Sequence, residues 1–97
     1  MILVNLQLKI DPAVREEFSQ WFRAILPDTR SYVGCSGLYV VEVEGDADAF
    51  EVVSQWESKA HYDDYLNWRT ESGDLDELGK YLAADPAFRF LPVLFEL

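Results

Sequence analysis

One histidine and one asparagine are the residues of this sequence best suited to proton chemistry. His61 is the only histidine, and histidine is the side chain whose ordinary pKa lies nearest to neutral pH, so it is the natural candidate for a general base. Asn5 could donate a hydrogen bond to an oxyanion that develops during a reaction, provided that it faces the same pocket. We therefore predict His61 and Asn5 as catalytic residues.

Four aromatic residues within a short stretch could form the walls of a slot for a flat ligand. They are Trp56, Tyr62, Tyr65 and Trp68. Such side chains offer large apolar surfaces, and tyrosine and tryptophan also carry one polar group that can orient a ligand. We predict that these four residues bind a small apolar or aromatic substrate. The sequence contains no metal-binding cluster, phosphate-binding glycine loop or serine nucleophile motif, so neither a metal nor a cofactor is expected.

Each candidate also has a purely structural interpretation. His61 can be a solvated residue in the first turn of a helix, and Asn5 can face water from a strand. Trp56 and the helix tyrosines can be core residues, because large aromatic side chains dominate protein cores. Arg69 can form an ion pair with one of the many acidic residues.

Alternating and helical periodicities predict the elements that must position these residues. Apolar side chains alternate over residues 2–10, which predicts a strand, and recur at helical spacing after Asp11-Pro12, which predicts a helix that ends near Pro27. Two further strands, predicted at 38–43 and 50–56, would form a hairpin. Ser58 would cap a helix that Gly73 closes. A short helix from 74 to 82 or 83 and a strand over 88–95 complete the chain, with Pro92 at an edge or a bulge.

Composition limits the class of protein. The 97 residues suffice for one domain, 1–97, and 49% of them are apolar, which favours a folded protein in water. The 18 acidic residues against eight basic ones give a net charge of -10, which disfavours binding to nucleic acid or to a membrane surface. Cys35 is the only cysteine, and the first residues lack the features of a signal peptide, so we expect a cytoplasmic protein.

The predicted order is strand, helix, two strands, helix, strand, which is an α+β fold with a four-stranded antiparallel sheet. Helices on one face of such a sheet leave the other face bare. A second copy of the chain is the simplest cover, since two-fold dimers are the most common soluble oligomers. We therefore predict a homodimer formed through the open sheet face.

The run from Trp56 to Tyr65, WESKAHYDDY, preceded by GCSGLY at residues 34–39 and by a strand and a helix, resembles the antibiotic biosynthesis monooxygenase domain. This resemblance extends over nearly the whole chain. It implies a ferredoxin-like βαββαβ fold of the dimeric α+β barrel type, with a cavity in each protomer. It also implies oxygenation of a quinol, a small aromatic or a polyketide phenol by dioxygen without metal or flavin.

The same resemblance implies site residues, and the chain departs from some of them. Trp56 and Tyr62 match the family's tryptophan and its helix tyrosine. Tyr65 stands where many members have a histidine, and Val52 stands where a polyketide-oxidising branch has an asparagine. Two alternatives therefore stay open: a non-catalytic dimeric module that binds a small ligand or serves a structural role, and a heme-degrading monooxygenase, to which Asn5 and Trp56 fit loosely.

Overall fold

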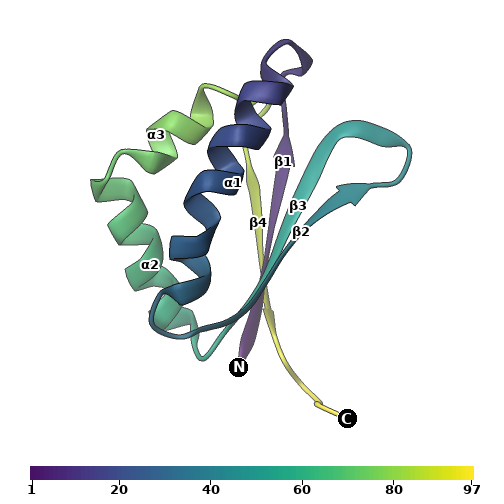
Figure 1. Cartoon of the computed structure of the whole chain (residues 1–97). Helices are drawn as coiled ribbons and strands as arrows, with labels where there is room; N and C mark the ends of the chain where they lie inside the picture. The colour runs from purple at the N-terminus through teal and green to yellow at the C-terminus, as the bar shows by residue number, and fades with distance from the viewer.

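One antiparallel sheet organises the computed structural model, which describes all 97 residues. Its strands are β1 (Ile2–Lys9), β2 (Cys35–Val43), β3 (Asp46–Trp56) and β4 (Ala87–Pro92). They lie in the order β2-β3-β1-β4, and each pair of neighbours is antiparallel. The first strand therefore lies inside the sheet, and β2 and β4 form its two edges (Figure 1).

Three helices cover one face of this sheet, and no helix covers the other (Figure 1). They are α1 (Arg15–Ser31), α2 (Lys59–Glu71) and α3 (Asp74–Gly79), and a short 3-10 turn, η1 (Pro12–Val14), precedes α1. The side chain of Asp11 accepts a hydrogen bond from the Ala13 N–H, and that of Ser58 accepts one from the His61 N–H, so both predicted caps are formed. The predicted α+β ferredoxin-like fold is confirmed.

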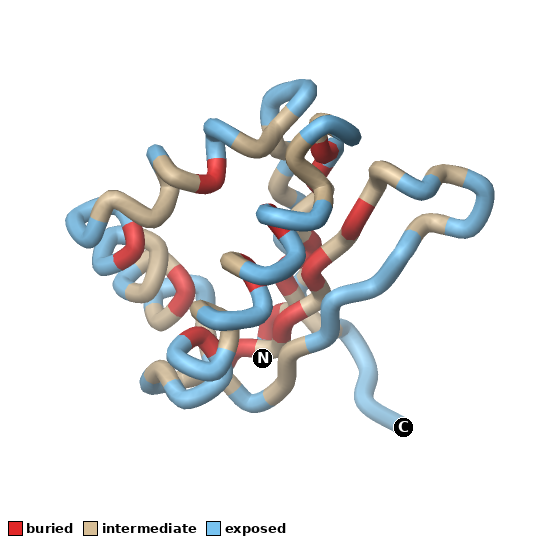
Figure 2. Tube along the Cα trace, turned by 45° about the horizontal axis from the view of Figure 1, so that its top comes forward, coloured by how far each residue is buried: buried red, intermediate tan, exposed pale blue.

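The alternation of β1 decides which side chains reach the helices. Its even-numbered residues point toward them, and Ile2, Val4 and Leu8 are buried there. Leu8 belongs to a cluster with residues of α1, and Val4 belongs to a second cluster with Trp56 and α2. Figure 2 shows the buried residues concentrated where strands and helices meet, while the outer faces of the helices are exposed.

The first helix differs from the prediction, because it does not end near Pro27 but continues to Ser31. A proline inside a helix removes one hydrogen bond and crowds the preceding turn, which normally ends the helix. Here the last turns are held from outside, since the Arg69 guanidinium donates to the Ile25 carbonyl and to the Thr29 hydroxyl. Tertiary contacts have therefore overridden the local signal.

The predicted boundaries of other elements were also wrong. The hairpin is longer than expected, because β2 begins at Cys35 and β3 at Asp46, with Gly45 in the left-handed conformation at the turn. By contrast, α3 stops at Gly79 and β4 stops at Pro92. Pro92 does lie on an edge strand, as predicted. The Val93 N–H still donates to the Met1 carbonyl, and residues 94–97 extend past the sheet as an exposed segment (Figure 2).

Candidate active site

A small cavity lies between the sheet and the helix layer. Its volume is about 50 Å³, which is room for roughly three or four water molecules. Most of its lining is apolar and comes from β1, β3, β4 and all three helices; the polar side chains among the lining residues are Thr29, Ser54, Tyr62, Tyr65, Arg69 and Asp74. An apolar pocket with a few convergent polar groups is the usual form of a small-molecule site.

The four aromatic residues predicted as substrate-binding gather in one cluster at this cavity. The ring centroid of Trp56 lies 5.3 Å from that of Tyr62 and 5.1 Å from that of Tyr65. Trp68 joins through Tyr65, at 6.1 Å. Only Tyr62 and Tyr65 line the cavity itself. Trp56 is completely buried, and Trp68 is 37% exposed and stacks on Tyr32.

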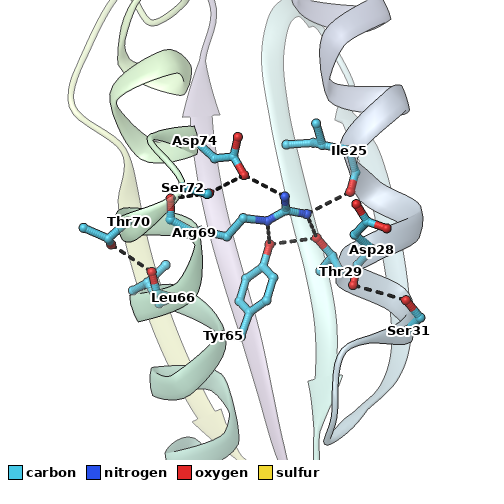
Figure 3. Close-up of polar contacts among 10 residues, drawn as sticks. All are labelled: Ile25, Asp28, Thr29, Ser31, Tyr65, Leu66, Arg69, Thr70, Ser72 and Asp74. Carbon is cyan, nitrogen blue, oxygen red and sulfur yellow. Dashed lines mark hydrogen bonds and ion pairs between the residues drawn. The ribbon is translucent and has the colours of Figure 1, made fainter.

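Arg69 is the centre of the polar network beside the cavity (Figure 3). It is only 4% exposed. Its Nε donates to the Tyr65 hydroxyl at 3.1 Å, its Nη1 to Asp74 Oδ2 at 2.8 Å, and its Nη2 to the Ile25 carbonyl at 2.8 Å and to Thr29 Oγ1 at 2.9 Å. One side chain of α2 thus connects α1 with the start of α3.

The charge of this network is fixed by its hydrogen bonds. Burial acts to lower the pKa of Arg69, but hydrogen bonds to Tyr65 and Asp74 outweigh it and raise that pKa, so the guanidinium stays charged. Burial likewise acts to raise the pKa of Asp74, but hydrogen bonds from Arg69 and Ser72 lower it overall. Asp74 is therefore an ion-pair partner and a poor base.

The lowered pKa of Asp74 makes the pair a source of pH-dependent stability. A carboxyl whose pKa is lower in the folded than in the unfolded state stabilises the fold above its unfolded pKa, about 3.9, and this contribution disappears as pH falls through the folded value. We expect the unfolding free energy of Asp74→Asn to be about 1–2 kcal/mol lower than that of wild type at pH 7. This difference in unfolding free energy should become smaller below about pH 4. Urea denaturation at several pH values measures it, with Asp63→Asn, an exposed carboxylate paired with Lys59, as the control. A gap that stays constant down to pH 3 would contradict this expectation.

Two residues that line the cavity, Ser54 and Tyr62, carry hydroxyl groups that donate no hydrogen bond within the chain. Tyr62 is 4% exposed, and its hydroxyl forms no hydrogen bond within the chain. Ser54 Oγ accepts from the Trp56 indole N–H at 2.8 Å but donates to no other protein atom. Burial, followed by the proximity of Tyr65 and Asp63, raises the pKa of Tyr62 well above its ordinary value. Tyr62 is thus a hydrogen-bond donor throughout the neutral range.

His61 lies outside this cavity, at the first turn of α2. Its Nδ1 is 2.7 Å from Ser58 Oγ, and its Nε2 is 3.7 Å from a carboxylate oxygen of Glu57. The ring packs directly against Gly34, whose φ is +93° and where a Cβ atom would come within 2.6 Å of the imidazole. The structure thus holds His61 in a local cap between α2 and the start of β2.

Asn5 lies on the opposite face of the sheet from the cavity. Its Nδ2 donates to Glu51 Oε1 at 2.9 Å, and its Oδ1 is buried without a hydrogen-bond partner. It faces away because Val4 and Leu6, its neighbours in β1, face the helices. The condition for a role as oxyanion donor, that Asn5 face the same pocket as the substrate, is not met in this arrangement.

Three residues of the site, Ser54, Thr29 and Asp74, were not predicted from the sequence. The signal for Ser54 is its place in β3, two residues before Trp56 and therefore on the same inward face. Asp74 and Thr29 become site residues only through Arg69, for which an ion pair was expected but no site. Thr29 lies 40 residues from Arg69 along the chain, so nothing local connects them.

Two further features of the chain concern metals and membranes. No group of three histidine, cysteine, aspartate or glutamate side chains is arranged to hold a metal ion. No helix has the length and apolar character that crossing a bilayer requires.

The fold and the apolar cavity define a ferredoxin-like α+β domain with a pocket between its sheet and its helices. The sequence model of the antibiotic biosynthesis monooxygenase family matches residues 1–71. The chain belongs to this family, as the resemblance of its sequence indicated. A comparison with curated protein sequences gives no match.

Solved structures share this fold at low sequence identity. One, an antibiotic biosynthesis monooxygenase, has a TM-score of 0.87 and 16% identity, and the match covers 97% of this chain and 99% of the other. Rv0793 from Mycobacterium tuberculosis has a TM-score of 0.78 and 22% identity, covering 98% and 96%. A MhuD variant with two manganese protoporphyrin IX molecules per active site has a TM-score of 0.77 and 14% identity, covering 100% and 98%.

The residues of this chain do not fit a heme group in the cavity. The common protein ligands of heme iron are histidine, cysteine, methionine and tyrosinate. His61 is outside the cavity, and the two tyrosines that line it are unsuited: the raised pKa of Tyr62 opposes ionisation, and the Tyr65 hydroxyl is held by Thr29 and Arg69. A volume of about 50 Å³ also leaves no room for a porphyrin.

Proposed function

We propose that this chain is a monooxygenase that oxidises a small aromatic, quinol or polyketide-type phenol with dioxygen, without a bound cofactor. The supporting observation is the apolar cavity lined by Tyr62 and Ser54, whose hydroxyl groups donate no hydrogen bond within the chain, and by the charged Arg69. Membership in a monooxygenase family supplies the reaction class, and the aromatic walls supply the preference for flat substrates.

The substrate supplies every electron that dioxygen takes up, so the reaction needs no other reductant. A phenol-bearing substrate with an activated CH₂ group loses a proton, and its anion transfers one electron to dioxygen. The two radicals combine, and loss of water leaves a carbonyl at the former CH₂. One oxygen atom enters the product, the other leaves as water, and the substrate supplies all four electrons. A dry cavity protects the radical pair from side reactions.

The protein assists this sequence by stabilising the substrate anion rather than by removing its proton. Asp74 is tied to Arg69, and Tyr62 is kept protonated, so neither is a free base. Donors aimed at a developing oxyanion in a water-poor site are among the strongest sources of rate enhancement. Tyr62 and Ser54 can donate to the substrate oxygen, and such hydrogen bonds favour the ionised substrate.

Oxygen consumption with labelled dioxygen tests this proposal. Purified protein is treated with a chelator and mixed with a panel of hydroquinones, anthrones and polyphenols, and the protein-free rate is subtracted. We expect consumption of one dioxygen per product molecule, with one ¹⁸O atom in the product and one in water. Rates equal to the protein-free control for every compound would count against the enzyme.

A non-catalytic ligand-binding module is the second candidate, and the size of the cavity favours it. A volume of about 50 Å³ is smaller than the roughly 150 Å³ that holds benzene in an engineered cavity. A ligand must therefore displace side chains whichever function holds. Calorimetric binding of a phenol without any oxygen uptake would assign the chain to this candidate.

His61→Ala separates catalysis in the cavity from chemistry at the helix cap. Because His61 does not line the cavity, we expect the turnover rate to stay within about threefold of wild type, while loss of the contact with Ser58 lowers the unfolding free energy by about 0.5–1 kcal/mol. Oxygen uptake and urea denaturation measure the two effects. If turnover instead falls by about two orders of magnitude while the fold stays intact, His61 is the general base.

We also propose a homodimer formed through the open sheet face. This face mixes polar groups, such as Asn5 and Glu51, with the exposed side chains of Tyr39 and Val41. Its mixed character suits contact with an identical surface, and closed two-fold pairs are the commonest way to cover such a face.

A further inference from the structure

We infer that residues 73–79, which are α3 and the glycine before it, form a lid over the cavity and open while the sheet, α1 and α2 stay folded. We call this segment the lid. The inference rests on the proposed function for the kind of ligand, a small phenol or quinol. It adds the wall of the cavity that moves to admit such a ligand.

The lid forms one wall of the cavity, which Asp74, Leu75 and Leu78 all line. A volume of about 50 Å³ is too small for an aromatic molecule, so a wall has to move before a ligand can enter. The other two helices that line the cavity have 17 and 13 residues, whereas α3 has six. A helix this short is not stable without contacts to the rest of the protein.

Few contacts hold the lid in place. Leu78 is its only buried residue and belongs to the apolar cluster that contains Leu8 and Phe18. The side-chain hydrogen bonds between the lid and α2 all run through Asp74, because Glu77 contacts only residues that follow the lid. A segment with so few buried contacts can open at a lower cost than the rest of a domain.

Glycines lie at both ends of the lid. Gly73 has a φ of +84°, which glycine adopts without strain. Gly79 has no such φ, and a Cβ atom at this position would meet no other atom within 4 Å. Neither conformation nor packing therefore requires glycine at 79, although glycine weakens a helix relative to alanine. Both positions supply the backbone freedom that a hinge needs.

The chain on either side of the lid is anchored. Ahead of it, Arg69 fastens α2 to α1, as described above. After it, the Tyr81 carbonyl accepts from the Asp11 N–H, and the Ala83 N–H donates to the Lys9 carbonyl, both at 2.8 Å. Movement is therefore confined to the segment between these two anchors.

One carboxylate fastens the closed lid. Asp74 Oδ2 accepts from Arg69 Nη1 and from Ser72 Oγ, both at 2.8 Å (Figure 3). When Asp74 moves away with the lid, Arg69 keeps its hydrogen bonds to Tyr65 and to α1. The Asp74 side chain is 24% exposed in the closed lid, so water can replace its partners. The lid can therefore open without separating α1 from α2.

Reaction of a thiol inside the cavity with an aromatic reagent measures this opening. Ser54→Cys places the thiol at a residue that is 4% exposed, and Cys35→Ser removes the other thiol of the chain. The reagent is 4,4′-dithiodipyridine: the thiolate attacks one sulfur, a mixed disulfide forms and 4-thiopyridone leaves. Because the closed cavity cannot hold the reagent, the labelling rate is proportional to the population of the open state.

Hydrogen exchange of the Glu77 amide measures the same opening without a reagent, because this amide donates to the Gly73 carbonyl at 3.0 Å. Exchange rates are divided by those of an unstructured peptide of the same sequence. In the wild type, we expect Glu77 to exchange at least about 100-fold faster than the hydrogen-bonded amides in the middle of α2. Urea below about 1 M should leave its rate unchanged, since a local opening exposes little surface.

Two variants should change labelling and exchange in opposite directions. Asp74→Asn removes the ion pair with Arg69 and should raise both rates about tenfold. Gly79→Ala restricts the hinge and should lower both rates about twofold to fivefold. Asp76→Asn, the same change at an exposed residue of the lid outside the ion pairs, should leave both rates within about twofold of the parent chain.

Three results would overturn the inference. One is exchange of Glu77 at the rate of the α2 amides. Another is labelling that stays constant when Asp74→Asn raises exchange, which would place the entrance elsewhere. The third is labelling that low urea accelerates as steeply as it accelerates global unfolding. Gly79→Ala keeps the test decisive if Asp74→Asn fails to fold, because it is expected to stabilise the closed lid.

These measurements need no turnover, so they separate the inference from the proposed function. A lid that opens as described without any oxygen uptake counts only against the proposed function. Oxygen uptake in a protein whose lid fails these tests counts only against the inference.

Discussion

Arg69→Met is expected to lower the free energy of unfolding by about 3 kcal/mol, which is a large part of the stability of a domain of this size. The substitution keeps most of the side-chain volume but removes all the donors. The Ile25 carbonyl and the Thr29 hydroxyl lose their donor, and Asp74 is left with a charge and no cation. The expected loss lies at the lower end of the range for broken buried pairs, because the Asp74 side chain is 24% exposed and partly hydrated. Urea denaturation at pH 7 measures the loss.

Two companion variants identify the cause of that loss. Lys80→Met removes an exposed cation that is paired only with Glu77 and should change stability by less than about 0.5 kcal/mol. The double variant Arg69→Met with Asp74→Leu should recover part of the loss, because it leaves no charge without a partner. If Arg69→Met alone stays within 1 kcal/mol of wild type, the network does not hold the helices together as described.

Tyr62→Phe is expected to lower kcat by about 100-fold while the fold is retained. Removal of a single donor to an oxyanion typically reduces the rate by about 10²–10³. Stability should change little, because the Tyr62 hydroxyl has no hydrogen-bond partner in the chain. Since burial raises the pKa of Tyr62, wild type should also show no loss of rate from ionisation of this residue as pH rises to about 10. Oxygen uptake between pH 6 and pH 10 measures both effects.

Tyr32→Phe is the matched control for this substitution. It removes the same atom from a tyrosine of the same aromatic cluster, whose hydroxyl contacts the Asp64 carbonyl away from the cavity. It should leave kcat within about twofold of wild type. Equal rates for Tyr62→Phe and wild type would remove Tyr62 from the proposed mechanism and leave the enzyme proposal to the labelled-oxygen result.

The fold could be predicted from sequence because its signals are local. Alternation in β1, the caps at Asp11 and Ser58, and the left-handed glycine at 73 all depend on neighbouring residues. The prediction that the first helix ends near Pro27 was wrong because the contact that extends the helix is distant in sequence. Nothing near that proline shows that Arg69, more than forty residues away, holds the helix past it.

The candidate site was predictable only in part, for the same reason. The aromatic cluster follows from the spacing of Trp56, Tyr62 and Tyr65, which places them on facing sides of a strand and a helix. The placement of Asn5 follows from the alternation of side chains along a strand. Because Val4 is buried on the helix side, its neighbour Asn5 faces the other side of the sheet. The alternation could be recognised in the sequence. The face of the sheet that borders the cavity could not, because it depends on how the helices pack.

The network of Arg69 has a consequence for the kinetics of ligand capture. Because one guanidinium ties α1, α2 and the start of α3 (Figure 3), these segments cannot separate without breaking several hydrogen bonds together. A cavity of about 50 Å³ behind such a layer admits an aromatic molecule only during rare openings. The observed association rate should then level off at high ligand concentration, at the opening rate of the layer, instead of rising in proportion to concentration. Stopped-flow quenching of tryptophan fluorescence would display this plateau, since Trp21 lines the cavity. Arg69→Lys, which can form fewer of these hydrogen bonds, should raise the plateau.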